Sequence, residues 1–477
     1  MRSLHARQGA SAGATILPVI DCRRGDSGLE ETLASLANAG GELDPVLIGG
    51  ATRPGTIRVD HPQELEPFIR DERTWLCPSS PGDRFAPGAI RNYATAASQA
   101  GGTRIIYADD DLMRPDGTRC APHFKPSWNP DLFENHDFVT GAAIVRASSD
   151  GLMKLPDADW AAALVDHGIK AGDPPKHVSL VLHHRCNRPA PRVPAKPQMV
   201  LPDRPPSVTT IIPTRNEVGL LRNCLAGLTR TAYPRVDCIV IDNDSDDPEA
   251  LAYLEKLESA GILVMRLPGP FNFSALNNAA VGHARGEYLC FLNNDVEMLD
   301  ADWLSLLVRQ AVRMDVGAVG ARLLYPDGSI QHAGVVTGIG GGAGHAHRLQ
   351  REDDEGYFHR ARLPQQVSAV TAACLVVAKE KFLAVEGFDE EKFTVAFNDV
   401  DLCLKLNAKG WQSFYEPRAT LIHHESKSRG HDRQGAKLVR FAGELAALKR
   451  KWRTDQERDP FHHLHLSPFC EQFLIAV

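Results

Sequence analysis

The stretch VTTIIPTRNEVGLLRNCLAGLTRTAYPRVDCIVID, from Val208 to Asp242, indicates the fold class of this chain. It opens with a β-branched run, Val208–Ile212, which is typical of a buried strand. Apolar residues then recur at helical spacing over Leu220–Thr231, and Cys238–Ile241 follows as a second buried strand. Two strands joined through a helix by short connections predict a parallel sheet covered by helices on both faces.

The same alternation continues beyond Asp242. The sequence predicts a helix at Pro248–Ala260, a strand at Ile262–Met265, a helix at Ser274–Ala284 and a strand at Tyr288–Leu292. Ligands of such sheets bind beyond the carboxyl ends of the strands. The polar residues directly after each strand are therefore the candidate binding residues.

Three of the predicted strands end in polar turns, which are Pro213–Asn216, Asp242–Ser245 and Asn293–Asp295. Asp and Asn often cap a following helix, and that interpretation is open for any single turn. Because parallel strands end at one edge of the sheet, we expect the three turns to meet in one crevice. Three polar turns in register favour a binding site.

Composition and charge limit the class of protein. The chain has 477 residues, of which 43% are hydrophobic and 24% charged, as in ordinary globular proteins. Lys and Arg number 53 against 60 Asp and Glu, so the net charge is −7. This mild acidity argues against a nucleic-acid partner, which would require a strongly basic face.

Membrane and secretion signals are weak. No apolar run approaches the roughly 18 residues of a membrane span, and the N-terminal residues lack the apolar core of a secretory signal. The ten cysteines are scattered and never spaced as C-x-x-C. We expect buried thiols in a reducing compartment, which predicts a cytoplasmic protein.

A proline-rich segment divides the chain. Seven prolines lie between Cys186 and Ser207, and this density excludes helix and central strand. We therefore predict a first domain at 1–186, a linker at 187–207, a second domain at 208–435, and a C-terminal amphipathic helix and tail at 436–477.

Segments of the first half resemble segments of the second half in the same order. The pairs are Ile16–Asp21 with Ile211–Asn216, Arg91–Leu112 with Asn277–Glu297, Asp157–Leu164 with Asn398–Lys405, and Ser179–His184 with Ala419–His424. We interpret them as a divergent internal duplication whose first copy is shortened. In this alignment Asp109–Asp111 corresponds to Asn293–Asp295. Val46–Ala51 lacks an acidic residue, so we expect a degenerate or accessory first domain.

Longer motifs in the second half resemble those of the bacterial family 2 glycosyltransferases. They are PTRNE, DNDS, FNFSALNNAAVGHARGEYLCFLNND, VGARLLYPDGSIQHAGVV, TAACLVV, GFDE, FNDVDLCLKL and HHESKSRG. The likeness is to the branch that builds surface polysaccharides, including rhamnosyltransferase-like members. It is dense from Ser207 to Gly430 and sparse in the first half. It implies a GT-A fold, an α/β arrangement with a Rossmann-like parallel-sheet nucleotide domain, here in two tandem copies.

The resemblance implies a divalent cofactor. The diphosphate of a nucleotide sugar leaves with two negative charges, which Mg²⁺ or Mn²⁺ can neutralise. The family uses an Asp-x-Asp motif after the fourth strand, and Asn293-Asn-Asp295 stands there with one carboxylate. A late histidine completes the site in the family. Asp295 and His423 are the implied metal ligands, with His424 as the alternative to His423.

The resemblance also implies a general base and donor contacts. An inverting transfer needs a base to deprotonate the acceptor hydroxyl, and Asp399 matches the family's second acidic residue, with Asn398 in place of the first. Asp401 is expected to point elsewhere or to cap the helix. The implied contacts to the nucleotide sugar are Pro213, Thr214, Asn216, Asp242, Asp244 as second choice to Asp242, Arg285, Asn293 and Asn294.

These features predict an inverting glycosyltransferase. Its partners would be a nucleotide-sugar donor and a growing surface glycan or lipid-linked acceptor, and the family suggests rhamnose as the sugar. The alternative is a catalytically inactive scaffold that binds sugar nucleotides or glycans. A nucleotidyltransferase would need a Gly- and Lys/Arg-rich phosphate loop after the first strand, which Pro213–Asn216 does not provide.

The last predicted helix, Lys437–Arg453, carries an apolar stripe on an otherwise basic surface. The stripe consists of Leu438, Phe441, Leu445, Leu448 and Trp452. Such a helix can lie on an anionic membrane surface or pack on its own domain. We favour packing, because a last helix usually docks on its own domain. Peripheral contact with the inner face of the cell membrane is the alternative.

Overall fold

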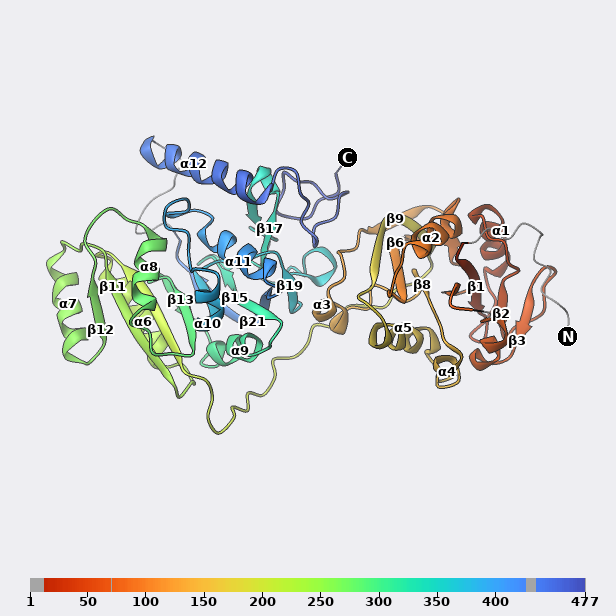
Figure 1. Ribbon diagram of the computed structural model, residues 1–477, viewed down its shortest axis with the longest axis horizontal. Coiled ribbons are helices and arrows are strands. Elements are labelled where there is room, and N and C mark those ends of the chain that lie inside the picture. The colour runs from red at the N-terminus through yellow and green to blue at the C-terminus, as the bar shows by residue number, and fades with distance from the viewer. Residues whose placement is uncertain (1–12, 70, 426–434, 477) are drawn as a thin grey trace. The chain divides into compact units, whose positions relative to one another are not determined.

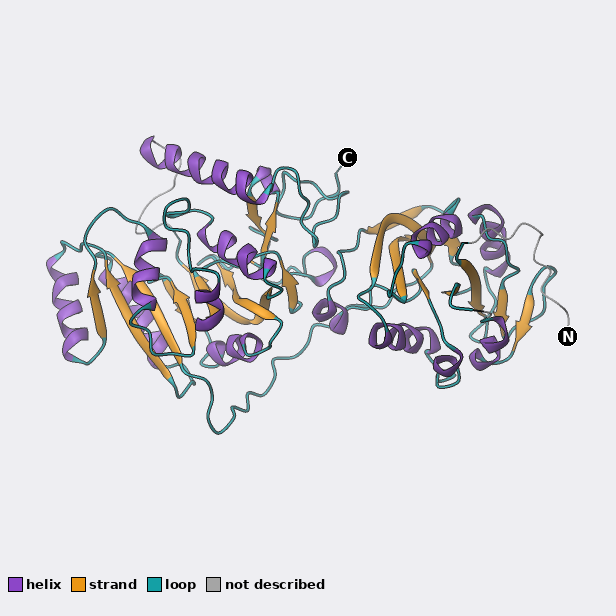
Figure 2. Ribbon diagram, viewed as in Figure 1, coloured by secondary structure: helices purple, strands orange, loops and turns teal. Residues whose placement is uncertain are grey.

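The computed structural model describes residues 13–69, 71–425 and 435–476. The chain forms two compact units. The first comprises Met1–Asn129 and His136–Pro191, and the second comprises Pro130–Asn135 and Arg192–Val477. Most of the proline-rich segment contains neither helix nor strand, as predicted (Figure 2).

The second unit begins with the predicted alternation of strands and helices. The strands are β10 (Val208–Thr214), β11 (Val236–Asp242), β12 (Leu263–Arg266) and β13 (Tyr288–Leu292). They pair in parallel in the order β12-β11-β10-β13 (Figure 1). The connecting helices are α6 (Val218–Thr229), α7 (Pro248–Ser259) and α8 (Phe273–Val281). Every element predicted between residues 208 and 292 is confirmed.

The sheet of the second unit continues beyond β13 with mixed pairing, in the order β12-β11-β10-β13-β20-β15-β21-β14. The further strands are β14 (Val296–Met298), β15 (Val316–Leu324), β16 (Ile330–His332), β19 (Gln365–Val367), β20 (Cys374–Ala378) and β21 (Gln412–His423). A separate hairpin pairs β17 (Val335–Thr337) with β18 (Ala343–His345). The further helices are α3 (Pro130–Asn135), α9 (Trp303–Ala311), α10 (Lys379–Ala384), α11 (Asn398–Ala408) and α12 (Gly435–Trp452), with short 3₁₀ turns at Ile339–Gly341 and Tyr357–His359.

Strand β10 is buried on both faces, which is consistent with its β-branched run Val208–Ile212. Successive side chains of a strand point to opposite faces. Ile211 packs in one apolar cluster with Leu276 of α8, and Ile212 packs in a second cluster with Leu221 of α6. Helices α8 and α6 thus pack on opposite faces of the sheet.

The first unit repeats the main strand order of this sheet, although the edge strand β19, which pairs with β21, has no counterpart among its described strands. Its strands are β1 (Thr15–Asp21), β2 (Val46–Ile48), β3 (Ile57–Val59), β4 (Thr74–Ser79), β5 (Arg84–Phe85), β6 (Ile105–Met113), β7 (Arg119–His123), β8 (Ala143–Val145) and β9 (Lys176–Arg185). Its helices are α1 (Leu29–Ala39), α2 (Ala89–Ser98), α4 (Ser149–Leu152) and α5 (Trp160–Ala171), with a 3₁₀ turn at Pro62–Phe68. The order β3-β2-β1-β4-β8-β6-β9-β5 matches that of the second unit. Each neighbouring pair runs in the same sense as its counterpart.

One aligned pair of the proposed duplication is wrong. By sheet position, β13 corresponds to β4, and β6 corresponds to β15. Asp109–Asp111 lies within β6 and therefore does not correspond to Asn293–Asp295, which follows β13. The error arose because a helix followed by an apolar strand and acidic residues has the same sequence pattern wherever it occurs in the sheet.

Helix α12 packs on its own unit through its second half, as favoured from the sequence. Leu448 is fully buried, and the indole Nε1 of Trp452 donates a hydrogen bond to Asp401 Oδ1 at 2.7 Å. Leu438 and Val439, in its first turns, are exposed. Among the described residues, no helix is both long and apolar enough to cross a membrane.

Candidate functional site

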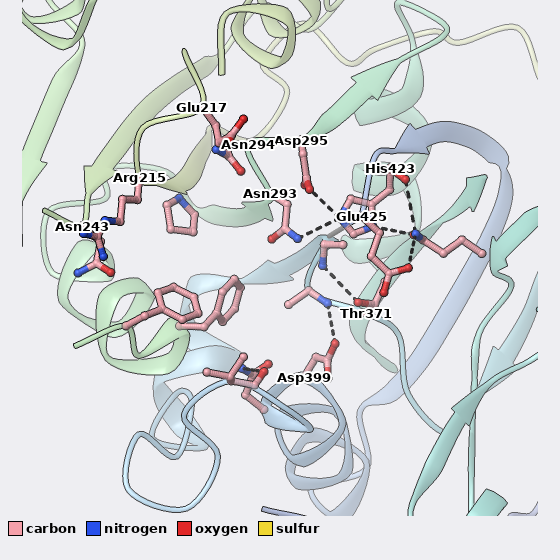
Figure 3. Close-up of a pocket in the computed structure, with 18 of the residues that line it drawn as sticks. Arg215, Glu217, Asn243, Asn293, Asn294, Asp295, Thr371, Asp399, His423 and Glu425 are labelled. Atoms are coloured by element: carbon pink, nitrogen blue, oxygen red, sulfur yellow. Dashed lines mark hydrogen bonds and ion pairs between the residues drawn. The ribbon is translucent and has the colours of Figure 1, made fainter. Parts of the chain in front are cut away.

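A cleft of about 740 Å³ opens at the carboxyl ends of β10, β11 and β13 (Figure 3). The three polar turns predicted to meet all contribute to its lining. The remaining lining comes from the start of α8, from β16, from β18 and the loop after it, from the segment before β20, and from the start of α11, the end of β21 and the start of α12. Of the predicted site residues, the cleft brings together Pro213, Asn216, Asn293, Asn294, Asp295, Asp399 and His423.

His423 and Asp295 face each other at the end of β21. The Nε2 atom of His423 lies 3.0 Å from Oδ1 of Asp295, and its Nδ1 lies 2.6 Å from the amide oxygen of Gln331. An amide oxygen can only accept, so Nδ1 carries the hydrogen and Nε2 presents a lone pair to Asp295 in the neutral ring. Asn293 Nδ2 lies 3.2 Å from the same Nε2.

This pair of donor atoms fits a small divalent ion. Two ligands at about 2.1 Å from one ion and at right angles to each other are about 3 Å apart. The second ring nitrogen of a histidine ligand is normally held by a hydrogen-bond acceptor, which is the position of Gln331. One carboxylate, one imidazole and neighbouring amides form a mixed oxygen and nitrogen set that accepts Mn²⁺ or Mg²⁺.

The alternative ligand, His424, points away from Asp295. Its Nε2 lies 3.2 Å from Glu297 Oε2, and only its backbone N–H contacts Asp295, by donating to the carbonyl oxygen at 3.0 Å. Successive residues of a strand alternate between faces, so only one of two adjacent histidines can face the cleft. The geometry favours His423.

Asp399 lies at the start of α11, across the cleft from Asp295 (Figure 3). Its Oδ2 accepts a hydrogen bond from the backbone N–H of Ala372 at 3.0 Å, and its Oδ1 accepts one from Val400 at 2.8 Å. These bonds orient the carboxylate while its remaining lone pairs face the cleft.

Asp401 turns away from the cleft, as expected from the sequence. It is fully buried, and Oδ1 accepts from Trp452 Nε1 and lies 2.7 Å from Lys451 Nζ. Lys405 Nζ lies 3.6 Å from its Oδ2. Asp401 therefore attaches α12 to α11.

Several predicted donor contacts organise the loops. The amide oxygen of Asn216 accepts from the backbone N–H groups of Asp246 and Asp247, each at 3.0 Å, and thereby ties the β10 turn to the β11 turn. Thr214 is buried and accepts from Asn294 Nδ2 at 2.9 Å, which joins the β10 and β13 turns.

Asp242 lies beside the cleft, and its neighbour Asn243 contributes to the lining. The Asp242 carboxylate is buried, pairs with Arg266 at 3.1 Å and accepts from the backbone N–H of Ser245. Its alternative, Asp244, is exposed with a φ of 68° and does not line the cleft.

Arg285 requires a correction. Its backbone N–H donates to Thr209 at 3.1 Å, at the start of β10. The amino ends of parallel strands lie at the edge opposite their carboxyl ends. Arg285 is therefore an exposed residue before β13, far along the sheet from the cleft, and we remove it from the candidate site.

The structure adds lining residues that the sequence did not single out, namely Gln331, His345, Arg348, Thr371 and Glu425. Gln331 Nε2 donates to Glu425 Oε2 at 3.0 Å. Gln331 lies in the motif VGARLLYPDGSIQHAGVV, which the family resemblance includes. A neutral amide or a lone basic residue in a loop has no periodicity or spacing that marks it as functional, so only the fold identifies these residues.

Comparison with known proteins gives the family. The model of the family "Glycosyl transferase family 2" matches residues 209–365, which include the three polar turns. This segment of the second unit therefore carries the pattern of glycosyltransferase family 2. The O-antigen biosynthesis protein RfbC of Myxococcus xanthus is 34% identical over 391 residues, covering 73% of this chain and 31% of that protein.

Two further relatives have different coverage. The protein y4gI of Sinorhizobium fredii, which has no described function, is 39% identical over 425 residues, 78% of this chain and 46% of its own. An N-acetylglucosaminyl-diphospho-decaprenol L-rhamnosyltransferase of Mycobacterium tuberculosis is 28% identical over 232 residues, 44% of this chain and 74% of its own. This chain thus spans less than half the length of y4gI and of RfbC.

In the part of the first unit that the structure describes, the histidine at the position of His423 does not face a carboxylate. His183 pairs with Phe85 of β5 as His423 pairs with Val296 of β14. His183 is buried, and its Nε2 lies 2.8 Å from the Tyr93 hydroxyl. Burial lowers the pKa of His183 to about 3. The side chain is therefore a neutral part of the core at neutral pH.

Two residues of the acidic triplet Asp109–Asp111, Asp110 and Asp111, also form ion pairs within the first unit. Asp110 Oδ2 lies 2.7 Å from Nζ of the buried Lys125, and the Arg188 guanidinium contacts the other carboxylate oxygen. Burial opposes ionisation of Asp110, but Lys125 and the neighbouring cations hold its pKa well below the usual range. Asp111 pairs with His184 and Arg119. Asp110 and Asp111 are thus neutralised within the fold.

Proposed function

We propose that this chain is an inverting glycosyltransferase of the GT-A type. It would move a sugar from a nucleotide-sugar donor to a hydroxyl of a growing surface glycan or lipid-linked acceptor. The observation that carries the proposal is the single cleft in which the Asp295–His423 pair and Asp399 line opposite sides. The family assignment of residues 209–365 supports it.

The donor would lie against the turns of β10, β11 and β13. Asn216 and Thr214 fix these turns relative to one another, so the nucleotide would meet a prepared surface. Pro213, Asn216, Asn293 and Asn294 line that surface. Asp242 holds Ser245 and Arg266 beside it and would contact the base from there.

Asp295 and His423 would hold the metal ion, with Gln331 orienting the imidazole. A bound Mg²⁺ or Mn²⁺ supplies positive charge that stabilises the departing diphosphate. Asp399 would accept the proton of the acceptor hydroxyl as that oxygen attacks the anomeric carbon. The backbone N–H groups of Ala372 and Val400 keep its carboxylate aimed at the cleft.

Relatives suggest the substrate class. One named relative transfers L-rhamnose to a lipid diphosphate-linked sugar, and another acts in O-antigen biosynthesis. We propose an acceptor of this kind for the present chain. The exposed Leu438 and Val439 lie beside the cleft-lining Lys437 and Arg440 on α12, which suits peripheral contact with an anionic membrane surface.

We further propose that the first unit is a divergent, accessory copy. Its sheet has the strand order of the second unit, while His183, Asp110 and Asp111 are used in internal contacts. Its role would be structural or glycan-binding rather than catalytic.

An assay of the purified chain with a panel of nucleotide sugars and Mn²⁺ tests the proposal. The expected result is slow donor hydrolysis that becomes sugar transfer when octyl glycosides are added, with inversion at the anomeric carbon. Binding of a donor without hydrolysis or transfer would contradict the enzyme and favour the scaffold. Retention of anomeric configuration would contradict Asp399 as the base of a single displacement.

A further inference from the structure

His345 lines the cleft but takes no part in the mechanism described so far. It is the last residue of β18, and its backbone N–H donates to Glu471 Oε1 at 2.9 Å. Its ring Nδ1 lies 2.8 Å from Nδ1 of His332, the last residue of β16, and the two rings meet edge to face. His345 and His332 thus form a contacting pair of histidines beside the cleft.

The two Nδ1 atoms share one hydrogen. A contact of 2.8 Å between two ring nitrogens requires that one donates and the other accepts. Burial lowers the pKa of both His332 and His345, although Asp399 and Glu471 oppose the effect at His345. Both rings are therefore neutral at neutral pH, and each carries a single hydrogen.

The surroundings of His332 decide which ring donates. His332 is fully buried, and its Nε2 has no hydrogen-bond partner within the described part of the chain. A buried N–H without an acceptor is the rarer and costlier kind of unsatisfied group in proteins. The hydrogen of His332 therefore lies on Nδ1, where His345 accepts it, and Nε2 of His332 is left as a lone pair.

The tautomer of His332 also determines which ring nitrogen of His345 carries the hydrogen. With Nδ1 accepting from His332, the hydrogen of His345 is on Nε2. No residue in the described ranges accepts from that Nε2. His345 thus offers an N–H donor among the lining residues of the cleft, near enough to Asp399 for that carboxylate to act on its pKa.

We propose that His345 is a specificity-determining residue that reads a second hydroxyl of the acceptor sugar, with His332 as the positioning residue that sets its tautomer. The inference rests on the proposed function. Asp399 would take the hydrogen of the attacking hydroxyl, while Nε2–H of His345 donates to the oxygen of a neighbouring hydroxyl. The acceptor would therefore be a sugar with two adjacent free hydroxyls, and an analogue lacking one leaves His345 unpaired.

The tautomer is tested without any turnover. The full chain is labelled with ¹⁵N-histidine, and resonances are assigned with His345→Gln and His332→Phe. We expect Nε2–H at His345 and Nδ1–H at His332. We also expect the His345 Nε2 resonance to shift when octyl N-acetyl-β-glucosaminide or octyl α-rhamnoside is added. Hydrogen on Nδ1 of His345, or no shift with either glycoside, would overturn the inference.

Kinetics give the second test. For His345→Ala we expect kcat/KM for the octyl glycoside to fall about 10- to 100-fold, while donor hydrolysis stays within about twofold, because water needs no second hydroxyl. The variant should also lose the preference for the glycoside over its monodeoxy analogues. His283→Ala, at an exposed position, is the control. Equal losses in transfer and hydrolysis, or retained discrimination, would contradict the proposal.

The two proposals fail in different ways. A wild-type chain that neither hydrolyses nor transfers any donor contradicts the glycosyltransferase activity. The ¹⁵N spectra and the glycoside-induced shift would still report whether His345 presents its N–H to a sugar. His332→Phe should leave the fold intact, as judged by thermal unfolding, and yet mix the two tautomers of His345. An unchanged Nε2–H tautomer in that variant would remove the positioning role of His332.

Discussion

The Nε2 atom of His423 and the Oδ1 atom of Asp295 lie 3.0 Å apart, although they are 128 positions apart in the sequence. The pairing of β14 with β21 brings them together, because Val296 is the register partner of His423. The distance is that expected for two ligands of one small ion. This relationship leads to the first two predictions.

Removing either member of the pair should weaken metal binding. We expect Asp295→Ala and His423→Ala each to reduce Mn²⁺ affinity, measured by titration calorimetry, and to weaken donor binding in parallel. His424→Ala is the matched control, because that ring pairs with Glu297 and not with Asp295. Full activity in excess chelator would contradict a metal-dependent mechanism.

Gln331→Leu should act through His423. The variant keeps the side-chain volume but removes the acceptor of the Nδ1 hydrogen, so the imidazole loses its orientation. We expect a loss of about 10- to 100-fold in Mn²⁺ affinity, whereas Gln331→Glu should retain binding because it still accepts. Unchanged affinity in Gln331→Leu would show that the ring is held without this bond.

Asp399→Asn should abolish transfer and preserve donor binding. A general base contributes about 10² to 10⁴ in rate, and the amide keeps the shape of the carboxylate without its basicity. Donor affinity is measured by calorimetry and transfer by product chromatography. Asp237→Asn, at an exposed position on β11, is the control. Near-native turnover of Asp399→Asn would place the base elsewhere.

Asp110→Asn should destabilise the first unit and leave transfer unchanged. The substitution leaves the buried Lys125 without its counter-charge, which costs about 3–5 kcal/mol. Asp166→Asn breaks the exposed Asp166–Lys170 pair and should cost less than about 1 kcal/mol. Hydrogen exchange in β6 and β9 measures the effect. Loss of transfer with intact protection would show that the triplet is catalytic.

Acid should weaken the first unit through His183. Its pKa is about 3 in the folded chain, because burial and the charges of Lys125 and Arg185 disfavour the cation, against about 6.5 when unfolded. The unfolded state binds the proton first, so stability is full above pH 6.5 and falls as the pH drops toward 3, by about 1.4 kcal/mol per unit.

The variant His183→Gln isolates this contribution. Glutamine has no proton to gain in this range and can still bond to the Tyr93 hydroxyl. We expect the unfolding free energy of the first unit to depend less steeply on pH between 6 and 4 than in the unchanged chain. Equal slopes for both proteins would show that His183 is not the titrating group.

The sequence was sufficient for the elements between residues 208 and 292 but not for the alignment of the two halves. The β-branched run at Val208–Ile212 favours a strand, and the helical spacing of apolar residues after it favours a helix. Arg91–Leu112 also reads as a helix, a strand and acidic residues, and it does form α2 and β6. Its place in the sheet depends on long-range pairing with β8 and β9, which no local pattern encodes.

The residues of the candidate site were likewise predicted only in part from the sequence. The polar turns that include Asn216, Asn243 and Asp295 could be located because each follows a strand, and strand ends share an edge. Arg285 was misplaced because a residue before a strand belongs to the opposite edge. Gln331 and His345 enter the site through β16 and the β17–β18 hairpin, whose short strands carry almost no periodic signal.

Helix α12 is tied to the segment before α11 through one buried carboxylate. Glu444 accepts hydrogen bonds from the Thr394 hydroxyl at 2.6 Å and from the backbone N–H groups of Val395 and Ala396 at 2.8 and 3.1 Å. That loop leads directly into α11 and Asp399. The exposed Leu438 lies about two turns before Glu444 on the same helix. We therefore expect that binding at the exposed end of this helix would shift the segment that carries Asp399, so that membrane or partner contact and sugar transfer would be coupled.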